Sequence, residues 1–288
     1  MKSKIYPLFV ILAGFFWGST GLFVRVLQSY GLDSLQISCI RLITAAILMF
    51  LFVLIKDKKL LKINPKDLWM FLLSGGFSVF FTCIFYFKTI SLASVSVACI
   101  LMYTAPIFVI ITSFFAFGEK LTKTKISAMI IAFFGCIFVS GIIGSDTKAI
   151  SPAGFLFGLG SGIAYASYSI FSKIALKKYS PYTVTFYSFL IAGIAAFFLA
   201  DFSAIFNIAA KNTELILLYP MTGLFVSVVP FLLYTLGLSG MESGPACVLS
   251  CTEPLVAALV SIFILSEPFS VSSVCGIIMI LISIIMLR

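Results

Sequence analysis

The stretch SCTEPLVAALVSIFILSEP, residues 250–268, has a weaker copy in MYTAPIFVIITSFFAFGEK, residues 102–120. An offset of 148 positions aligns Pro254 with Pro106 and Glu267 with Glu119. The same offset aligns three further pairs: Trp17 with Tyr165, Arg25 with Lys173, and Tyr86 with Tyr234. A repeat at one fixed offset indicates that the chain contains two copies of a single structural unit.

The composition indicates that this unit folds in a lipid bilayer. Of 288 residues, 61% are hydrophobic and 10% are charged, whereas charged residues make up about a quarter of an ordinary soluble domain. Windows of about 20 residues resolve ten apolar runs: 5–26, 34–55, 68–90, 94–117, 123–142, 153–175, 181–200, 215–238, 243–265 and 270–287. We therefore predict an all-α membrane protein with ten transmembrane helices.

Each copy contains five of these helices, which divides the chain into repeats at residues 1–145 and 146–288. Because five is an odd number, the second repeat must enter the membrane from the opposite side. Such inverted repeats are typical of transporters that work by alternating access, in which the two halves exchange conformations. The duplication therefore predicts a transporter.

The basic residues predict the orientation. With the N-terminus in the cytoplasm, 14 of the 19 basic residues fall on the cytoplasmic side: Lys2, Lys4, Lys56, Lys58, Lys59, Lys62, Lys66, Lys120, Lys123, Lys125, Lys173, Lys177, Lys178 and Arg288. This asymmetry obeys the positive-inside rule and places both termini of a multi-pass protein on the cytoplasmic face of the cell membrane. It also accounts for the net charge of +9, so we expect no nucleic-acid partner.

The sequence predicts no metal site, no cofactor and no enzymatic activity. All seven cysteines fall inside predicted spans, none forms a Cys-x-x-Cys pair, and the chain has no histidine, so zinc and haem sites are not expected. Intramembrane hydrolysis would need paired catalytic groups at one depth, and none is present. The chain also lacks a phosphate-binding loop for ATP.

Two charged residues lie deep within predicted spans, Arg41 and Glu253. A charge at that depth costs several kcal/mol and marks a functional candidate. Glu253 corresponds to Ala105 in the first repeat and so breaks the symmetry, whereas Glu119 and Glu267 correspond to each other and are expected to tie helix ends to neighbouring helices. We therefore predict that Arg41 and Glu253 bind substrate; a structural Glu253 carboxyl, protonated or paired with Arg41, is the alternative.

Aromatic residues and prolines complete the predicted site. The predicted substrate-binding aromatics are Trp17, Tyr103, Tyr165, Tyr168 and Tyr234, and the predicted kink or gating prolines are Pro106, Pro230 and Pro254. An aromatic wall with one carboxylate and one guanidinium suits a zwitterion such as an amino acid, or an organic cation held by cation–π contact. The residue types leave both classes open.

Small residues predict close helix packing. Gly154, Gly158, Gly162 and Ala166 are spaced four apart, and Gly14 and Gly18 repeat the pattern in the first helix. Because lipid supplies no hydrophobic drive for association, such residues let backbones approach closely. We expect the first and sixth helices to cross near the centre of the bundle.

Several motifs carry a family resemblance: FFWGSTGLFVRVL (15–27), ISCIRLITAAILMFL (37–51), LASVSVACILMYTAPIFVIITSFFAFGEKLT (92–122) and LSEPFS (265–270). In this order, within a duplicated ten-helix frame, they resemble the EamA-type branch of the drug/metabolite transporter superfamily. The resemblance covers essentially the whole chain. It implies two inverted five-helix repeats, a central cavity surrounded by helices 1–4 and 6–9, peripheral helices 5 and 10, and transport, often export, of small metabolites or drugs.

We therefore predict a secondary transporter that exports small metabolites, namely amino acids, related zwitterions or organic cations, across the cytoplasmic membrane. Proton coupling through Glu253 and uniport both remain open, as do a monomer and a homodimer. The expected partners are a small-molecule substrate and the lipid bilayer. The alternative is a membrane sensor or scaffold without transport, which would leave no motif.

Overall fold

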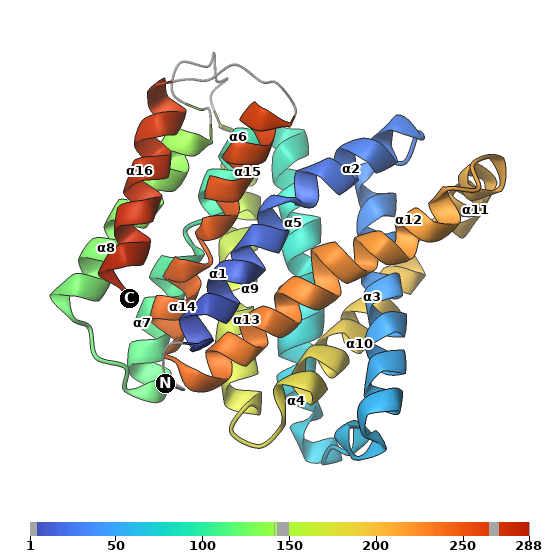
Figure 1. Ribbon diagram of the computed structural model, residues 1–288, viewed down its shortest axis with the longest axis horizontal. Coiled ribbons are helices and arrows are strands. Elements are labelled where there is room, and N and C mark those ends of the chain that lie inside the picture. Colours follow the sequence, from blue (N-terminus) through green and yellow to red (C-terminus); the bar gives the residue numbers. More distant parts are fainter. Residues whose placement is uncertain (1–4, 141, 143–149, 265–270, 288) are drawn as a thin grey trace.

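The computed structural model describes residues 5–140, 142, 150–264 and 271–287, and within these ranges the chain is almost entirely helical, without strands (Figure 1). Eight helical spans of 19 to 28 residues are apolar enough to cross a membrane: Ile5–Ser29, Ser34–Lys56, Pro65–Leu92, Val95–Phe117, Pro152–Ala175, Pro181–Leu199, Leu215–Gly240 and Ser243–Phe263. The other two predicted spans contain shorter helices, α8 (Lys123–Val139) and α16 (Val271–Met286). The predicted all-helical membrane fold is confirmed.

Many of the spans consist of shorter helices in line. The elements are α1 (Ile5–Gly18), α2 (Thr20–Ser29), α3 (Ser34–Lys56), α4 (Leu68–Phe71), η4 (Leu72–Phe80), α5 (Phe81–Leu92), α6 (Val95–Met102), α7 (Ala105–Phe117), α8, α9 (Pro152–Ala175), α10 (Pro181–Leu199), α11 (Phe202–Lys211), α12 (Leu215–Thr222), η5 (Gly223–Val228), α13 (Val229–Gly240), α14 (Ser243–Leu249), α15 (Thr252–Phe263) and α16. Two short 3₁₀ turns, η2 (Lys58–Leu61) and η3 (Pro65–Asp67), connect α3 to α4.

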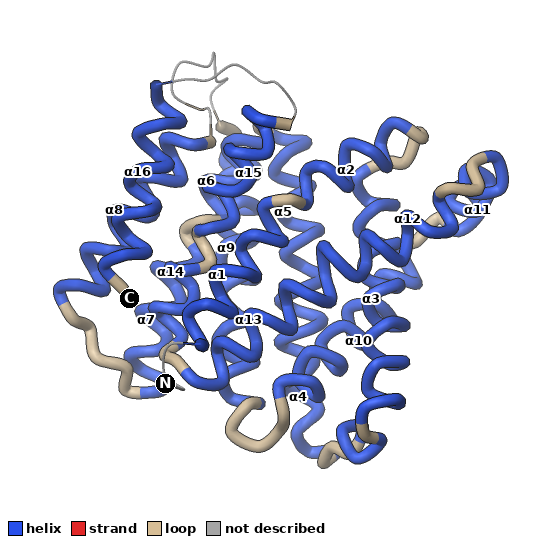
Figure 2. The backbone as a smooth tube through the Cα atoms, viewed as in Figure 1, coloured by secondary structure: helices blue, strands red, loops and turns tan. Residues whose placement is uncertain are grey.

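The fourth and ninth predicted helices are interrupted at nearly equivalent places. The interruption between α6 and α7 spans 103–104, and that between α14 and α15 spans 250–251 (Figure 2). Pro106 and Pro254 follow these interruptions, where their missing N–H groups and rings disfavour a continuous helix. The two repeats therefore share a helix that is broken near the middle of its apolar span.

The third and eighth predicted helices each contain a π-helical segment. These segments are η4 and η5, and Pro230 lies directly after η5 in the first turn of α13. π-Helical turns are uncommon and frequently accompany functional sites. The apolar runs predicted the spans but not this change of helical geometry.

The two repeats interlock. Helix α1 packs against α13 and α15 of the second repeat, and α9 of the second repeat packs against α5, α6 and α7 of the first. Two equivalent pairs complete the arrangement, α3 with α10 and α8 with α16; α8 and α16 lie side by side at the left edge of Figure 1. This pseudo-symmetric exchange is the inverted-repeat architecture that the duplication predicted.

The predicted small-residue faces of α1 and α9 pack against the broken helices of the opposite repeat. A Cβ atom added to Gly14 would lie 2.8 Å from Thr252 Cβ and 3.2 Å from the Ser250 carbonyl oxygen. At the equivalent Gly162, it would lie 2.6 Å from Thr104 Oγ1 and 2.7 Å from the Leu101 carbonyl oxygen. The glycines of α1 and α9 therefore contact the two helix interruptions rather than each other.

A short helix that the sequence analysis did not predict, α11, lies beyond α12 at the right edge of Figure 1. Its N-terminus is capped by the Asp201 side chain, which accepts a hydrogen bond of 3.0 Å from Ala204 N. The predicted repeat boundary at 145/146 lies outside the described residues and stays a prediction.

Candidate functional site

Glu253 lies in the first turn of α15, immediately after the interruption of the ninth span. Its Oε2 atom is buried and makes no hydrogen bond within the described part of the chain. The hydroxyl groups of Tyr103 and Tyr165 lie within interaction range of the carboxyl group, and the Arg41 guanidinium attracts it. Tyr103 and Tyr165 therefore lie beside Glu253, and Arg41 lies within electrostatic range of it.

Arg41 projects from α3 toward α5. Its Nη2 atom donates a hydrogen bond of 3.0 Å to Cys83 Sγ. Within the ranges that the structure describes, Arg41 and Glu253 form no direct ion pair, so the pairing that would make Glu253 a purely structural residue is absent in this conformation. Among the described residues, neither charged group has an opposite charge in contact with it.

The remaining predicted aromatics form one packed cluster. The indole of Trp17 lies 5.5 Å from the Tyr234 ring and 6.3 Å from the Tyr165 ring, centroid to centroid. The Tyr168 ring lies 6.1 Å from that of Tyr234. Tyr168 Oη is 2.8 Å from Thr235 Oγ1, so its hydroxyl is satisfied within the second repeat. The structure thus brings Trp17, Tyr165, Tyr168 and Tyr234 together, and Tyr103 lies beside Glu253 instead.

Phe231 is the residue of this cluster that sequence reasoning missed. Its ring lies 5.0 Å from both Trp17 and Tyr168, and 5.1 Å from Phe189. Only its position after Pro230 distinguishes it in the sequence, because the chain has 32 phenylalanines. Cys83, the partner of Arg41, was also missed.

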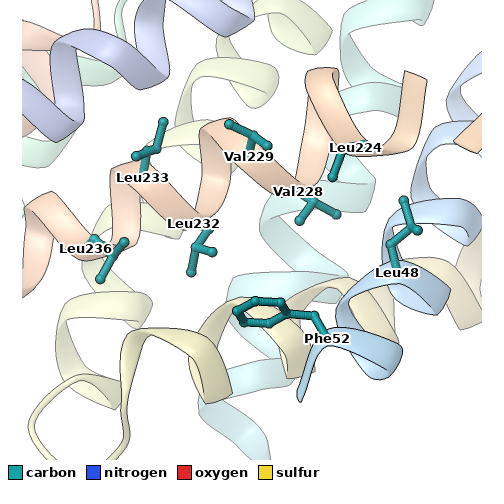
Figure 3. Close-up of a pocket in the computed structure, with 8 residues that line it drawn as sticks. All are labelled: Leu48, Phe52, Leu224, Val228, Val229, Leu232, Leu233 and Leu236. Atoms are coloured by element: carbon teal, nitrogen blue, oxygen red, sulfur yellow. The ribbon is translucent and has the colours of Figure 1, made fainter. Parts of the chain in front are cut away.

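Two apolar pockets lie elsewhere in the molecule. One pocket of about 300 Å³ lies between α3 and the eighth span and is lined only by leucine, valine and phenylalanine, among them Leu48, Phe52 and Leu232 (Figure 3). The other, of about 590 Å³, lies among α3, α11 and α12. Neither contains a predicted site residue, and the first has no polar side chain with which to bind a charged metabolite.

Cross-repeat contacts join the two halves at one end of the bundle. This end carries the α3–α4, α7–α8 and α9–α10 connections, and we call it the lysine-rich end. Here the Glu119 carboxylate, just after α7, accepts hydrogen bonds of 2.7 Å from Ser243 N and 3.2 Å from Gly244 N, at the start of α14. Lys125 forms an ion pair with Glu242 beside them. Glu119 therefore ties a helix end to its neighbour, as predicted; Glu267 lies outside the described residues.

A second cross-repeat contact at this end centres on Asp67. Lys178 Nζ lies 2.7 Å from Asp67 Oδ1, and Tyr179 Oη donates a hydrogen bond of 2.7 Å to Asp67 Oδ2. The hydrogen bond to the Asp67 carboxylate raises the pKa of the Lys178 ammonium above its ordinary value. Asp67 belongs to the first repeat and its two partners to the second, so this contact also joins the halves.

The prolines lie where helices begin again after an irregular turn. Pro106 and Pro230 occupy the first turns of α7 and α13, and Pro254 that of α15. Ala105, the counterpart of Glu253, is fully buried and packs beside Ala166 and Cys247. The acid is therefore present at only one of two equivalent breaks.

Comparison with known proteins agrees with this architecture. The chain is 28% identical over 283 residues to the "Uncharacterized transporter YwfM" of Bacillus subtilis (strain 168), covering 96% of this chain and 91% of that protein. It is 26% identical to the "Uncharacterized inner membrane transporter YicL" of Salmonella typhimurium, covering 96% and 93%. One solved crystal structure superposes with a TM-score of 0.78 over 99% of this chain and 96% of that one, at 16% identity, and supports the fold alone.

The sequence pattern of the EamA-like transporter family matches the chain twice, at residues 4–141 and 152–288. The two matches coincide with the two interlocked halves described above, one on each side of the undescribed residues 143–149. The relatives bear the names of transporters rather than enzymes. The chain is therefore a multi-pass membrane transporter that belongs to the EamA-like transporter family.

Proposed function

We propose that the protein is a secondary transporter that exports zwitterionic metabolites of the amino-acid class across the cytoplasmic membrane by alternating access. The observation that carries this proposal is the buried Oε2 atom of Glu253, which has no hydrogen-bond partner among the described residues. Burying a polar atom without a hydrogen-bond partner inside a membrane protein costs free energy. A substrate ammonium group that donates a hydrogen bond to Oε2 would remove this cost.

Arg41 favours a zwitterion over a simple organic cation. A guanidinium close to the acid repels a ligand that is only positive, but it can form two parallel charge-assisted hydrogen bonds with a substrate carboxylate. The thiol that Arg41 contacts at 3.0 Å is a weak acceptor by comparison. A zwitterion therefore satisfies both charged groups.

The contacts at the lysine-rich end support alternating access. That end is expected to face the cytoplasm, with both termini, because of the positive-inside rule. The hydrogen bonds of Glu119 and Asp67 join the two repeats there, as a closed gate at this end would require. In the transport cycle these hydrogen bonds break while equivalent contacts form at the other end. Monomers and homodimers are equally compatible with this scheme.

Flux into and out of proteoliposomes tests the proposal. Purified protein is supplied with a panel of amino acids, quaternary ammonium compounds and cationic dyes, with and without a pH gradient. We expect flux of at least one zwitterion, and we expect Glu253→Gln to reduce it at least tenfold while the protein elutes from size exclusion unchanged. Flux by Glu253→Gln with the wild-type rate and pH profile would remove Glu253 from the mechanism.

The same panel separates the competing functions. If only the quaternary ammonium compounds and dyes are transported, the substrate is an organic cation and not a zwitterion. No flux of any compound, together with a stably bound partner protein, would favour a sensor or scaffold. A pH gradient that drives wild-type but not Glu253→Gln flux would assign proton coupling to this acid, whereas indifference to the gradient would indicate uniport.

A further inference from the structure

The two repeats place different chemistry at one pair of equivalent positions. The offset of 148 aligns Cys83 with Phe231. Helices α3 and α10 slip by one residue, since their capping residues Asp33 and Ser180 are 147 positions apart, so Arg41 corresponds to Ser188. Arg41 and Cys83 join α3 to α5 by a hydrogen bond of 3.0 Å. In the second repeat, Phe231 of α13 contacts Phe189 of α10 instead, with ring centroids 5.1 Å apart. The same helix contact is therefore polar in the first repeat and aromatic in the second.

We call the region around α9 and α13 the second-repeat side of the bundle centre, and it is filled by packed side chains. Phe231 contacts Trp17 and Tyr168, with ring centroids 5.0 Å apart in both cases. The hydroxyl of Tyr234 is 2.6 Å from Ser169 Oγ, within hydrogen-bond distance. Trp17, Tyr168 and Tyr234 are all buried. The buried polar atoms here that lack a hydrogen-bond partner, such as Ser172 Oγ and Thr185 Oγ1, are uncharged hydroxyl groups, which offer no charge to bind a zwitterion.

The first-repeat side carries the charged groups, Arg41 and Glu253, instead. Tyr86, the counterpart of Tyr234, has its hydroxyl 3.0 Å from Cys99 Sγ rather than from a serine. Both Tyr86 and Cys99 lie within electrostatic range of Glu253. Thiols are weak hydrogen-bond partners, so both Arg41 and Tyr86 keep most of their capacity to bind a ligand.

We propose that the substrate binds on the first-repeat side of the centre, between α3, α5, α6 and α15, and that Cys83 is a specificity-determining residue there. The proposal rests on the proposed function and deepens it. The substrate carboxylate takes the place of the Cys83 thiol on the Arg41 guanidinium, which exchanges a weak acceptor for a charged one. Cys83 contributes the room that a phenylalanine removes at the equivalent position of the second repeat.

Thiol alkylation compares the two equivalent positions directly. The first variant retains Cys83 as its sole cysteine; the second has all native cysteines replaced and carries Phe231→Cys. Both are treated in proteoliposomes with N-ethylmaleimide, which reacts with thiols that water reaches. We expect Cys83 to react at least tenfold faster than the introduced thiol. Equal rates, or faster reaction at position 231, would overturn the assignment of the site to the first repeat.

A filling substitution tests the specificity role. Cys83→Phe gives the first repeat the residue that the second repeat has, and we expect it to reduce flux at least tenfold. The control is Cys275→Phe, at an exposed cysteine of α16, which should stay within about threefold of wild type. Wild-type flux by a correctly folded Cys83→Phe protein would remove the specificity role. If no compound of the panel is transported by the wild type, the proposed function fails, but the alkylation contrast still decides where the water-accessible site lies.

Discussion

At the residue scale, the duplication separates acids that look alike in the sequence. Glu253 and Glu119 each lie close to a proline-containing helix, but only Glu119 finds backbone N–H partners, at Ser243 and Gly244. The acid without a counterpart, Glu253, is the one with an unsatisfied buried oxygen. In this protein, the absence of an acidic counterpart in the other repeat therefore indicates a functional glutamate better than the presence of a glutamate alone does.

Glu119→Ala should destabilise the protein, because it leaves two N–H groups at the start of α14 without their charged acceptor. A charge-assisted cap of this kind contributes about 1–2 kcal/mol. Thermal unfolding in detergent, followed by the loss of the size-exclusion peak, measures the effect. Glu214→Ala is the matched control, since Glu214 precedes α12 without capping it; an equal loss in both variants would contradict the role of Glu119.

The charged candidates could be predicted from the sequence, whereas their neighbours could not. Arg41 and Glu253 stand out because a charge is rare and costly at that depth. Cys83 and Phe231 resemble many other residues of the chain, and only the contacts of α5 and α13 distinguish them. Which side of the centre is filled depends on packing between segments far apart in the sequence.

At the scale of the helices, the apolar runs predict where the spans lie but not how each is built. Pro106 and Pro254 indicate the two central interruptions, since a proline disfavours the preceding helical turn. Segment η4 has no proline, so its π-helical geometry has no sequence signal of this kind. Helix α11 was missed because the segment between the seventh and eighth apolar runs was too short and too polar for a span.

Gly162→Ala should disturb the interruption between α6 and α7. The added Cβ would lie 2.7 Å from the Leu101 carbonyl oxygen, closer than atoms normally pack, so the backbone must move. Overpacking of this kind costs about 1–3 kcal/mol. Gly21→Ala is the control, because its Cβ would have no neighbour within 4 Å. We expect the unfolding temperature to fall in Gly162→Ala but not in Gly21→Ala. Equal unfolding temperatures of the two variants would show that the backbone around Leu101 can move to accept the added Cβ atom at no cost.

At the scale of the whole molecule, the lysine-rich end is a contact surface between the repeats. Asp67 of the first repeat contacts Lys178 and Tyr179 of the second. If the halves move apart during transport, this contact must open in every cycle. A covalent bond at the same place should then stop transport without unfolding the protein.

The variant Asp67→Cys, Lys178→Cys in a background without native cysteines tests this expectation. Oxidation should form a disulfide and reduce flux at least tenfold, and reduction should restore it. The control pair is Ser180→Cys, Thr183→Cys, whose hydroxyl groups are 3.0 Å apart within one helical turn. Undiminished flux through the cross-linked Asp67/Lys178 pair would mean that the lysine-rich end does not open.

The interlocking of α1 with α13 and α15 also has a consequence for biosynthesis. Helix α1 enters the membrane first, yet the residues that cover Gly14, and the Phe231 and Tyr234 rings beside Trp17, belong to segments that begin more than 200 positions later. At the usual rates of translation, the ribosome needs on the order of 10 to 50 s to reach them. Throughout this interval the first helix must wait in lipid, or beside an insertion factor, with its small-residue face uncovered, and neither repeat can complete its own packing until the other has been inserted.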